Sequence, residues 1–134
     1  YVITLENGEK VAVCTDLGIV TDEVRNAITG ARTVLIESNH DVEKLRRGPY
    51  PAALKLRILS DEGHLSNNAC AWELPSLVQS GTKRIILGHL SEENNTPLLA
   101  ASAAKATLAE ICAKEQEDYI LKIAKPKTPE VTLF

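Results

Sequence analysis

Three histidines are the residues of this chain best suited to metal or acid–base chemistry, and each lies in a polar segment. His40 lies in Glu-Ser-Asn-His-Asp (residues 37–41), while His64 and His89 each lie in a copy of Gly-His-Leu-Ser (residues 63–66 and 88–91). Each copy follows an apolar or strand-like segment, and Asp16 likewise follows an apolar run. Imidazole and carboxylate groups at the ends of buried strands are the ligand types of hydrolytic metal sites.

Each of these residues also has an ordinary structural explanation. Asp16 could be a turn former, and His64 could make a structural hydrogen bond at the start of a helix. His89 could bond the backbone of its own loop, and His40, beside Asp41, could only orient its loop. Residue type and spacing alone leave both interpretations open.

The composition is that of one soluble domain with a small local excess of positive charge. A length of 134 residues fits one domain, and 44% hydrophobic residues with 4% aromatic ones predict a core of Leu, Ile, Val and Ala. The formal net charge of −3 argues against a generally basic nucleic-acid-binding surface. One segment nevertheless has five cations and one acid, Glu43, and is either a solvated helix face or a phosphate-contacting patch: Lys44, Arg46, Arg47, Lys55 and Arg57.

Several protein classes are disfavoured by missing motifs. The three cysteines, Cys14, Cys70 and Cys112, lie in apolar surroundings and predict reduced core thiols of a cytoplasmic protein. The absence of Cys-x-x-Cys disfavours a thiolate zinc knuckle. Neither a Gly-x-Ser-x-Gly motif nor a P-loop occurs, which disfavours a serine hydrolase and an NTPase. No apolar run approaches the ~18 residues of a membrane span, so we expect no membrane partner.

Turn residues and apolar periodicity predict an α/β order of elements. Asn7-Gly8 between two strand-like runs, 1–5 and 10–15, predicts a hairpin. Further strands are predicted at 33–37, 83–87, 119–124 and 130–134, and helices at 22–28, 41–47, 51–59, from Ser66 or Asn67 to Gln79, and from Thr96-Pro97 to about Lys114. Glu37 and His89 then lie at strand ends beside helix starts, where open α/β sheets place their chemistry.

Five motifs in this order resemble the metallo-β-lactamase superfamily and, within it, the YycJ (WalJ) family. They are Cys-Thr-Asp-Leu-Gly (14–18), Leu-Ile-Glu-Ser-Asn-His-Asp (35–41), Tyr-Pro with Leu-Lys-x-Arg-Ile (50–51 and 54–58), Gly-His-Leu-Ser-Asn (63–67) and Leu-Gly-His-Leu-Ser-Glu-Glu-Asn-Asn (87–95). The resemblance implies that residues 1–134 are the C-terminal half of an αββα sandwich, a mixed sheet with helices on one face. The superfamily's His-x-His-x-Asp-His ligand motif is absent and would precede Tyr1.

The resemblance also implies roles for individual residues. Asp16 matches the carboxylate that bridges two metal ions, and His89 matches the last histidine ligand, on the second metal. Glu37 and His64 take the places of a catalytic Glu–His pair that, in related nucleases such as tRNase Z, stabilises the pentacoordinate phosphate and helps the leaving oxygen depart. The nuclease interpretation makes four residues candidates for substrate binding and leaves two as structural: Lys55, Arg57, Ser66 and Asn67, then His40 and Asp41.

The function implied by the resemblance is metal-dependent phosphodiester hydrolysis, as a 5′→3′ exonuclease acting on DNA rather than RNA. Two divalent ions, Zn, Mn or Fe, would activate the attacking water. A small-ester, thioester or lactone hydrolase of the same fold and a non-catalytic interaction domain are the alternatives. We expect the chain alone to be inactive, to bind metal weakly, and to self-associate or pair with a preceding N-terminal half.

Overall fold

A five-stranded mixed sheet organises the chain, and the computed structural model describes residues 1–124 of it. The strands lie in sequence order: β1 (Val2–Thr4), β2 (Lys10–Cys14), β3 (Thr33–Glu37), β4 (Arg84–Gly88) and β5 (Ile120–Ile123). β1 is antiparallel to β2, and every later pair is parallel. The predicted hairpin and the three following strands are confirmed to within a residue or two. The strand predicted at 130–134 lies outside the described residues.

The five helices found in residues 1–124 begin where capping residues predict them. They are α1 (Asp22–Ile28), α2 (Val42–Arg47), α3 (Ala52–Ile58), α4 (Asn67–Gln79) and α5 (Pro97–Glu110). Thr21, Asp41, Ser66 and Thr96 each accept a hydrogen bond from a backbone N–H of the first turn, which stabilises the helix start. Ser66, not Asn67, is therefore the cap of α4. α5 ends earlier than predicted because Cys112 has a left-handed backbone with φ of 58°.

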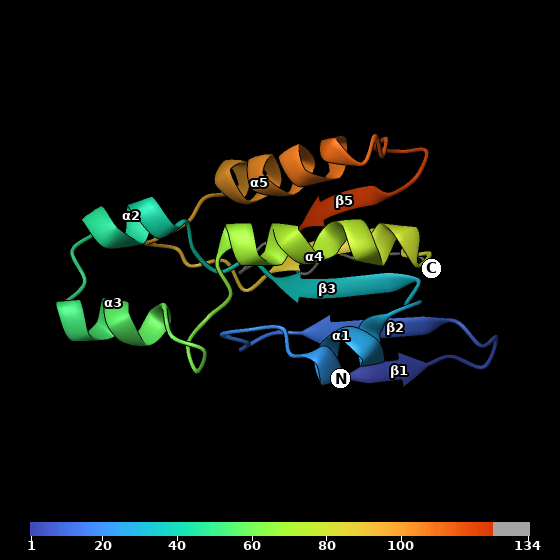
Figure 1. Ribbon diagram of the computed structural model, residues 1–134, viewed down its shortest axis with the longest axis horizontal. Helices are drawn as coiled ribbons and strands as arrows, with labels where there is room; N and C mark the ends of the chain where they lie inside the picture. Colours follow the sequence, from blue (N-terminus) through green and yellow to red (C-terminus); the bar gives the residue numbers. More distant parts are fainter. Residues whose placement is uncertain (125–134) are drawn as a thin grey trace.

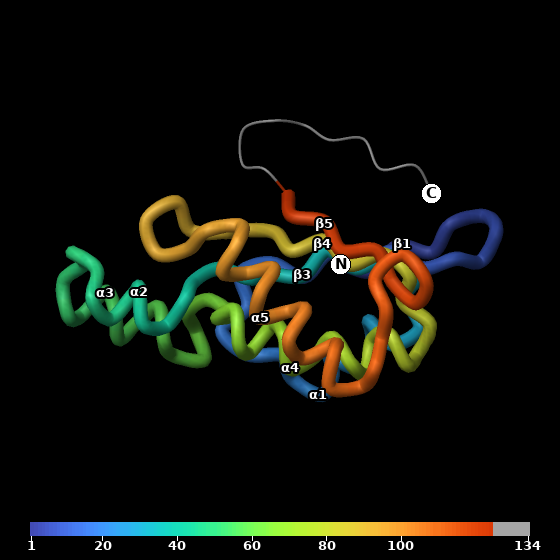
Figure 2. Tube along the Cα trace, turned by 90° about the horizontal axis from the view of Figure 1, so that it is seen from above, coloured from blue at the N-terminus to red at the C-terminus, as the bar shows by residue number. Residues whose placement is uncertain are grey.

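α1, α4 and α5 cover one face of the sheet, and α4 packs along α5 (Figures 1 and 2). The core between the layers takes its sheet residues from alternate strand positions, Ala12, Val34, Ile36, Ile85 and Leu87, and its helix residues from Leu74, Leu77, Ala100, Ala104 and Leu108. This arrangement confirms the predicted fold class, a mixed sheet with helices on one face. On the other face, apolar side chains remain partly exposed: Val11, Val13, Leu35, Ile86 and Ile120.

α2 and α3 form an arm beyond the carboxyl ends of the parallel strands (Figures 1 and 2). α3 contributes no buried residue to the core, so burial in this half of the sheet does not explain its leucines. Leu54, Leu56 and Leu59 are all exposed. The arm therefore has a role other than packing against the described core.

Two of the three predicted core thiols are buried. Cys14 and Cys70 are free and buried, whereas Cys112 is free and exposed. The prediction was wrong for Cys112 because this residue lies in the turn after α5 and not on the buried face of the helix. None of the helices in residues 1–124 is long and apolar enough to cross a membrane.

Candidate metal and hydrolytic site

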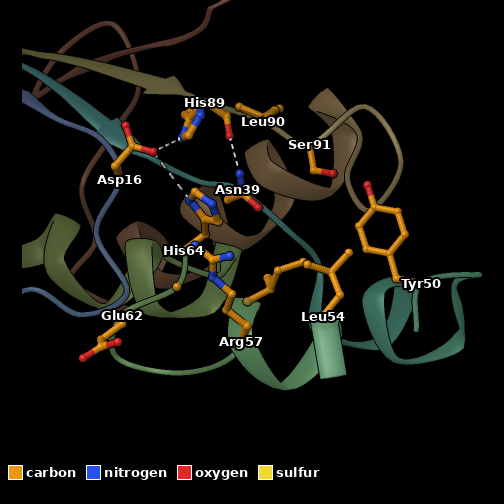
Figure 3. A pocket seen from close by; sticks show the side chains of 12 residues that line it. Asp16, Asn39, Tyr50, Leu54, Arg57, Glu62, His64, His89, Leu90 and Ser91 are labelled. Carbon is orange, nitrogen blue, oxygen red and sulfur yellow. Dashed lines mark hydrogen bonds and ion pairs between the residues drawn. The ribbon is translucent and has the colours of Figure 1, made fainter. Parts of the chain in front are cut away.

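Asp16, His64 and His89 converge at the carboxyl edge of the sheet. Asp16 follows β2, His89 follows β4, and His64 lies in the loop before α4. One potential ligand atom from each of the three lies within 4.8 Å of the others. Figure 3 shows the Asp16 carboxylate facing both imidazole rings. The structure therefore brings together both predicted metal ligands and one predicted catalytic residue.

Glu37, the last residue of β3, lies beneath this cluster and is completely buried. Its Oε1 lies 2.8 Å from His64 Nδ1 and 2.7 Å from His89 Nδ1. Its Oε2 accepts a 2.8 Å hydrogen bond from the backbone N–H of Leu17. A carboxylate can only accept, so both rings donate from Nδ1 and keep the lone pair on Nε2. One buried carboxylate thus sets the tautomer of both histidines.

Asp16 and His89 share an uncommon backbone conformation. Their φ angles are 58° and 55°, in the left-handed region that L-residues other than glycine visit rarely. Such a conformation costs of the order of 1–2 kcal/mol per residue and is concentrated at functional sites. Both residues lie directly past a strand end, where this backbone turns the chain sharply at the edge of the cluster.

Two glycines allow the surrounding loops to approach one another. A Cβ added at Gly18 would lie 2.2 Å from the backbone oxygen of Asp61, and one at Gly63 would lie 2.3 Å from that of Arg57. No side chain fits at either position. The glycines therefore let the loop after Asp16 contact the loop that carries His64.

Ser38, Asn67 and Asn95 form a buried polar network, which we call the amide clamp. The Ser38 hydroxyl donates to Asn67 Oδ1 at 2.7 Å, and the two amides pair reciprocally at 2.9 and 2.8 Å. Asn95 Nδ2 also donates to the Ser38 carbonyl at 2.8 Å. All three residues are buried. The clamp joins the three segments that carry the site's glutamate and two histidines.

The two residues after the first Gly-His-Leu motif, Ser66 and Asn67, are already engaged with the protein. The Ser66 hydroxyl accepts from Ala69 N, and the Asn67 amide belongs to the clamp. Their contact with substrate therefore stays a prediction without geometric support. The polar stretches after the two Gly-His-Leu-Ser copies were the sequence signal for the clamp, which sequence reasoning missed.

His40 and Asp41 lie on the same segment but behave differently. Asp41 caps α2 by accepting from Lys44 N at 2.8 Å. His40 is 1% exposed, and among residues 1–124 neither ring nitrogen has a hydrogen-bond partner. Burial, with a smaller contribution from His64, lowers the pKa of His40. The ring is therefore neutral in the folded protein at neutral pH.

Only one cation of the basic segment faces the cluster. Arg57 lines the cavity beside His64, and within residues 1–124 its guanidinium has no partner. Lys55 instead donates from Nζ to the Arg46 carbonyl at 2.7 Å. Residues two apart on a helix point about 200° apart, so Lys55 and Arg57 lie on opposite sides of α3. The other cations are also engaged, Lys44 with the Glu93 carbonyl and Arg46 and Arg47 with Glu43.

The cavity at this edge has a volume of about 560 Å³. The cluster of Asp16, His64 and His89 forms one side of it. The opposite side comes from the arm and includes Tyr50 and Leu54 (Figure 3). This volume lies within the usual range for small-ligand sites.

Comparison with known proteins agrees with this geometry. The chain is 41% identical over 123 residues to Exodeoxyribonuclease YycJ of Bacillus anthracis and 43% identical over 124 residues to Exodeoxyribonuclease WalJ of Streptococcus pneumoniae. This chain is a homologue of the YycJ/WalJ exodeoxyribonucleases. The matches cover 92% of the chain but only 47% and 46% of those proteins, so the chain spans about half their length. No family model and no solved structure matches it.

The cluster of this YycJ/WalJ homologue fits a divalent ion. One carboxylate and two imidazoles with free Nε2 atoms are ligands that suit zinc, manganese or iron. Three protein ligands leave coordination positions open, as a hydrolytic site requires. In residues 1–124 this is the single group of three or more such donors. A second ion would need donors from elsewhere.

Proposed function

We propose that this chain supplies half of the two-metal active site of a 5′→3′ DNA exonuclease that hydrolyses phosphodiester bonds. The observation that carries the proposal is the convergence of Asp16, His64 and His89 over one buried carboxylate, Glu37. The relatives named exodeoxyribonucleases support DNA as the substrate. The unpartnered Arg57 in the cavity favours a phosphodiester over a small ester or lactone.

Each residue has a distinct part in this proposal. Asp16 and His89 would hold divalent ions, which when bound lower the pKa of a water and align the attacking and leaving oxygens. His64 would stabilise the reacting phosphate and help the leaving oxygen depart through Nε2. Glu37 would act through both rings by fixing their tautomers. Arg57 would offset the charge of the phosphate.

The chain is proposed to be the C-terminal half of an αββα sandwich. Three observations support this: it covers about half the length of its relatives, its described donors suffice for one ion, and one sheet face keeps apolar side chains partly exposed. A preceding N-terminal half would cover that face and supply the remaining ligands. Without it the chain should self-associate, because partly exposed apolar surface favours association.

The experiment compares the complete protein, including the preceding segment, with residues 1–134 alone. Each is stripped of metal, reloaded with zinc, manganese or iron, and given 5′-labelled DNA, 3′-labelled DNA, the matching RNA, and a lactone. We expect metal-dependent release of nucleotides from the 5′ end of DNA by the complete protein only. The chain alone should be inactive and should scatter light as an oligomer.

Two results would contradict the proposal. Turnover of the lactone without turnover of DNA would select the small-ester hydrolase. Tight metal binding without turnover of any substrate would select the non-catalytic interaction domain. A compact monomer of residues 1–134 that binds two ions tightly would refute the assignment of the chain as half a site.

A further inference from the structure

The cavity has two chemically different sides. Asp16, His64 and His89 make one side polar and anion- or metal-directed, while Tyr50 and Leu54 make the other side apolar (Figure 3). Arg57 lies between them in the same lining. A nucleotide has the same division, with a charged phosphate at one end and an apolar, stackable base at the other.

Tyr50 is placed on an unusually stiff stretch of chain. It stands between Pro49 and Pro51, in the connection from α2 to α3. Proline fixes its own φ and restricts the residue before it to extended conformations, so Pro51 limits the backbone of Tyr50. A ring held in place before binding loses little conformational entropy when a ligand stacks on it.

Packing of the described protein does not account for the apolar side of the cavity. Leu54 remains 39% exposed, and α3 has no buried residue at all. Tyr50 is only partly buried, and within residues 1–124 its hydroxyl makes no hydrogen bond. These side chains therefore present an aromatic ring and an aliphatic neighbour to the cavity and not to the core.

We propose that Tyr50 and Leu54 form a platform for the base of the nucleotide whose phosphate lies over Asp16, His64 and His89. The inference rests on the proposed nuclease function and adds a binding site for a specific part of the substrate. Arg57 contacts the phosphate between the two sides. Because every base has a stackable face, the platform selects for the presence of a base and not for its identity.

The test uses the complete protein and single-stranded 5′-phosphorylated oligonucleotides that differ at one position. One has a normal sequence, two have an abasic tetrahydrofuran at the first or second nucleotide, and a control has it at the sixth. Wild-type kcat/KM should fall about ten-fold for an abasic first or second nucleotide, which is within the range of base–aromatic stacking, and should not change for the sixth.

Variants of Tyr50 then assign the loss to this side chain. Tyr50→Phe should retain the discrimination, whereas Tyr50→Leu and Tyr50→Ala should lower kcat/KM on normal DNA about ten-fold and no longer distinguish the abasic substrates. Leu56→Ala is the matched control, because Leu56 is on the same helix, is 71% exposed and does not line the cavity. It should behave as wild type.

Equal wild-type rates on all four oligonucleotides would overturn the platform, and this comparison needs no variant to fold. Discrimination that survives in Tyr50→Leu would also overturn it. Failure of the nuclease proposal gives a different result, since the wild-type protein would then release nothing even from the normal oligonucleotide.

Discussion

Replacing Glu37 by glutamine should uncouple both histidines from the metal site while changing no atom that touches metal or substrate. The wild-type carboxylate accepts three hydrogen bonds, two at Oε1 from His64 and His89 and one at Oε2 from Leu17 N. A glutamine amide offers one acceptor atom and one donor atom. No orientation of that amide satisfies three donors.

Each orientation of the amide has a separate cost. If its oxygen faces the rings, its NH₂ opposes the Leu17 N–H, which lies 2.8 Å from that position in the wild type. A buried N–H without an acceptor costs about 1–3 kcal/mol. If its NH₂ faces the rings, both must accept at Nδ1 and carry their protons on Nε2. The Nε2 lone pairs are then lost as ligands.

The expected result of Glu37→Gln is a loss of metal affinity of roughly 100-fold, or about 2.8 kcal/mol. Removing a partner that orients one ligand typically costs about 10–100-fold, and the upper end applies because Glu37 orients two rings. Chelator competition on the complete protein measures the affinity, and ¹⁵N NMR of the imidazoles reports the tautomers directly.

Glu73→Gln is the matched control. Glu73 is also buried, at 7% exposure, and accepts two 2.9 Å hydrogen bonds from Arg25, but it lies outside the cluster. The control should lose stability without losing metal affinity. If Glu37→Gln binds metal as tightly as Glu73→Gln does, the proposed role of the shared carboxylate is refuted.

Three further predictions follow from the site. Asp16→Ala should lose bound metal, whereas His64→Ala should keep it and lose ~10²-fold in turnover; metal analysis of both variants decides, and metal loss in His64→Ala would make His64 a ligand. Arg57→Ala should reduce the salt dependence of DNA binding by about one unit of slope per phosphate contact, while Lys55→Ala should not; equal slopes would return Arg57 to a solvated helix face. Burial lowers the pKa of His40, a shift that the nearby carboxylates oppose without cancelling, so the unfolded chain binds more protons below its ordinary value of about 6.5. Stability should therefore fall as pH drops through this range, and His40→Leu should flatten the pH dependence seen in urea titrations; an unchanged profile would show that His40 does not titrate differently on folding.

Element boundaries were predictable because their signals are local. Asn7-Gly8 requires a tight turn, which Gly8 makes with φ of 83°, and Thr21, Asp41 and Thr96 cap the helices they were expected to begin. The one ambiguous cap, between Ser66 and Asn67, could not be decided locally. Asn67 is drawn into a network with residues 29 and 28 positions away, and this leaves Ser66 to cap the helix.

The site was predictable in part for a different reason. Residue type and position at strand ends selected Asp16, His64 and His89, since the carboxyl ends of parallel strands meet at one edge of the sheet. The bonding of one Glu37 oxygen to two rings depends on tertiary geometry and has no sequence signal. The separation of Lys55 from Arg57 did have one, because a spacing of two on a helix places side chains on opposite sides.

The strained residues and the buried network are parts of one arrangement. The left-handed conformations of Asp16 and His89 are unfavourable by themselves, and they persist only where surrounding contacts fix them. Those contacts are on the page: Leu17 N bonds Glu37, the Asn39 amide donates to the His89 carbonyl at 2.8 Å, and the amide clamp joins the flanking segments. All of them come from this chain and none needs an ion. The histidines are therefore oriented before metal arrives, which lowers the cost of ordering the site on binding.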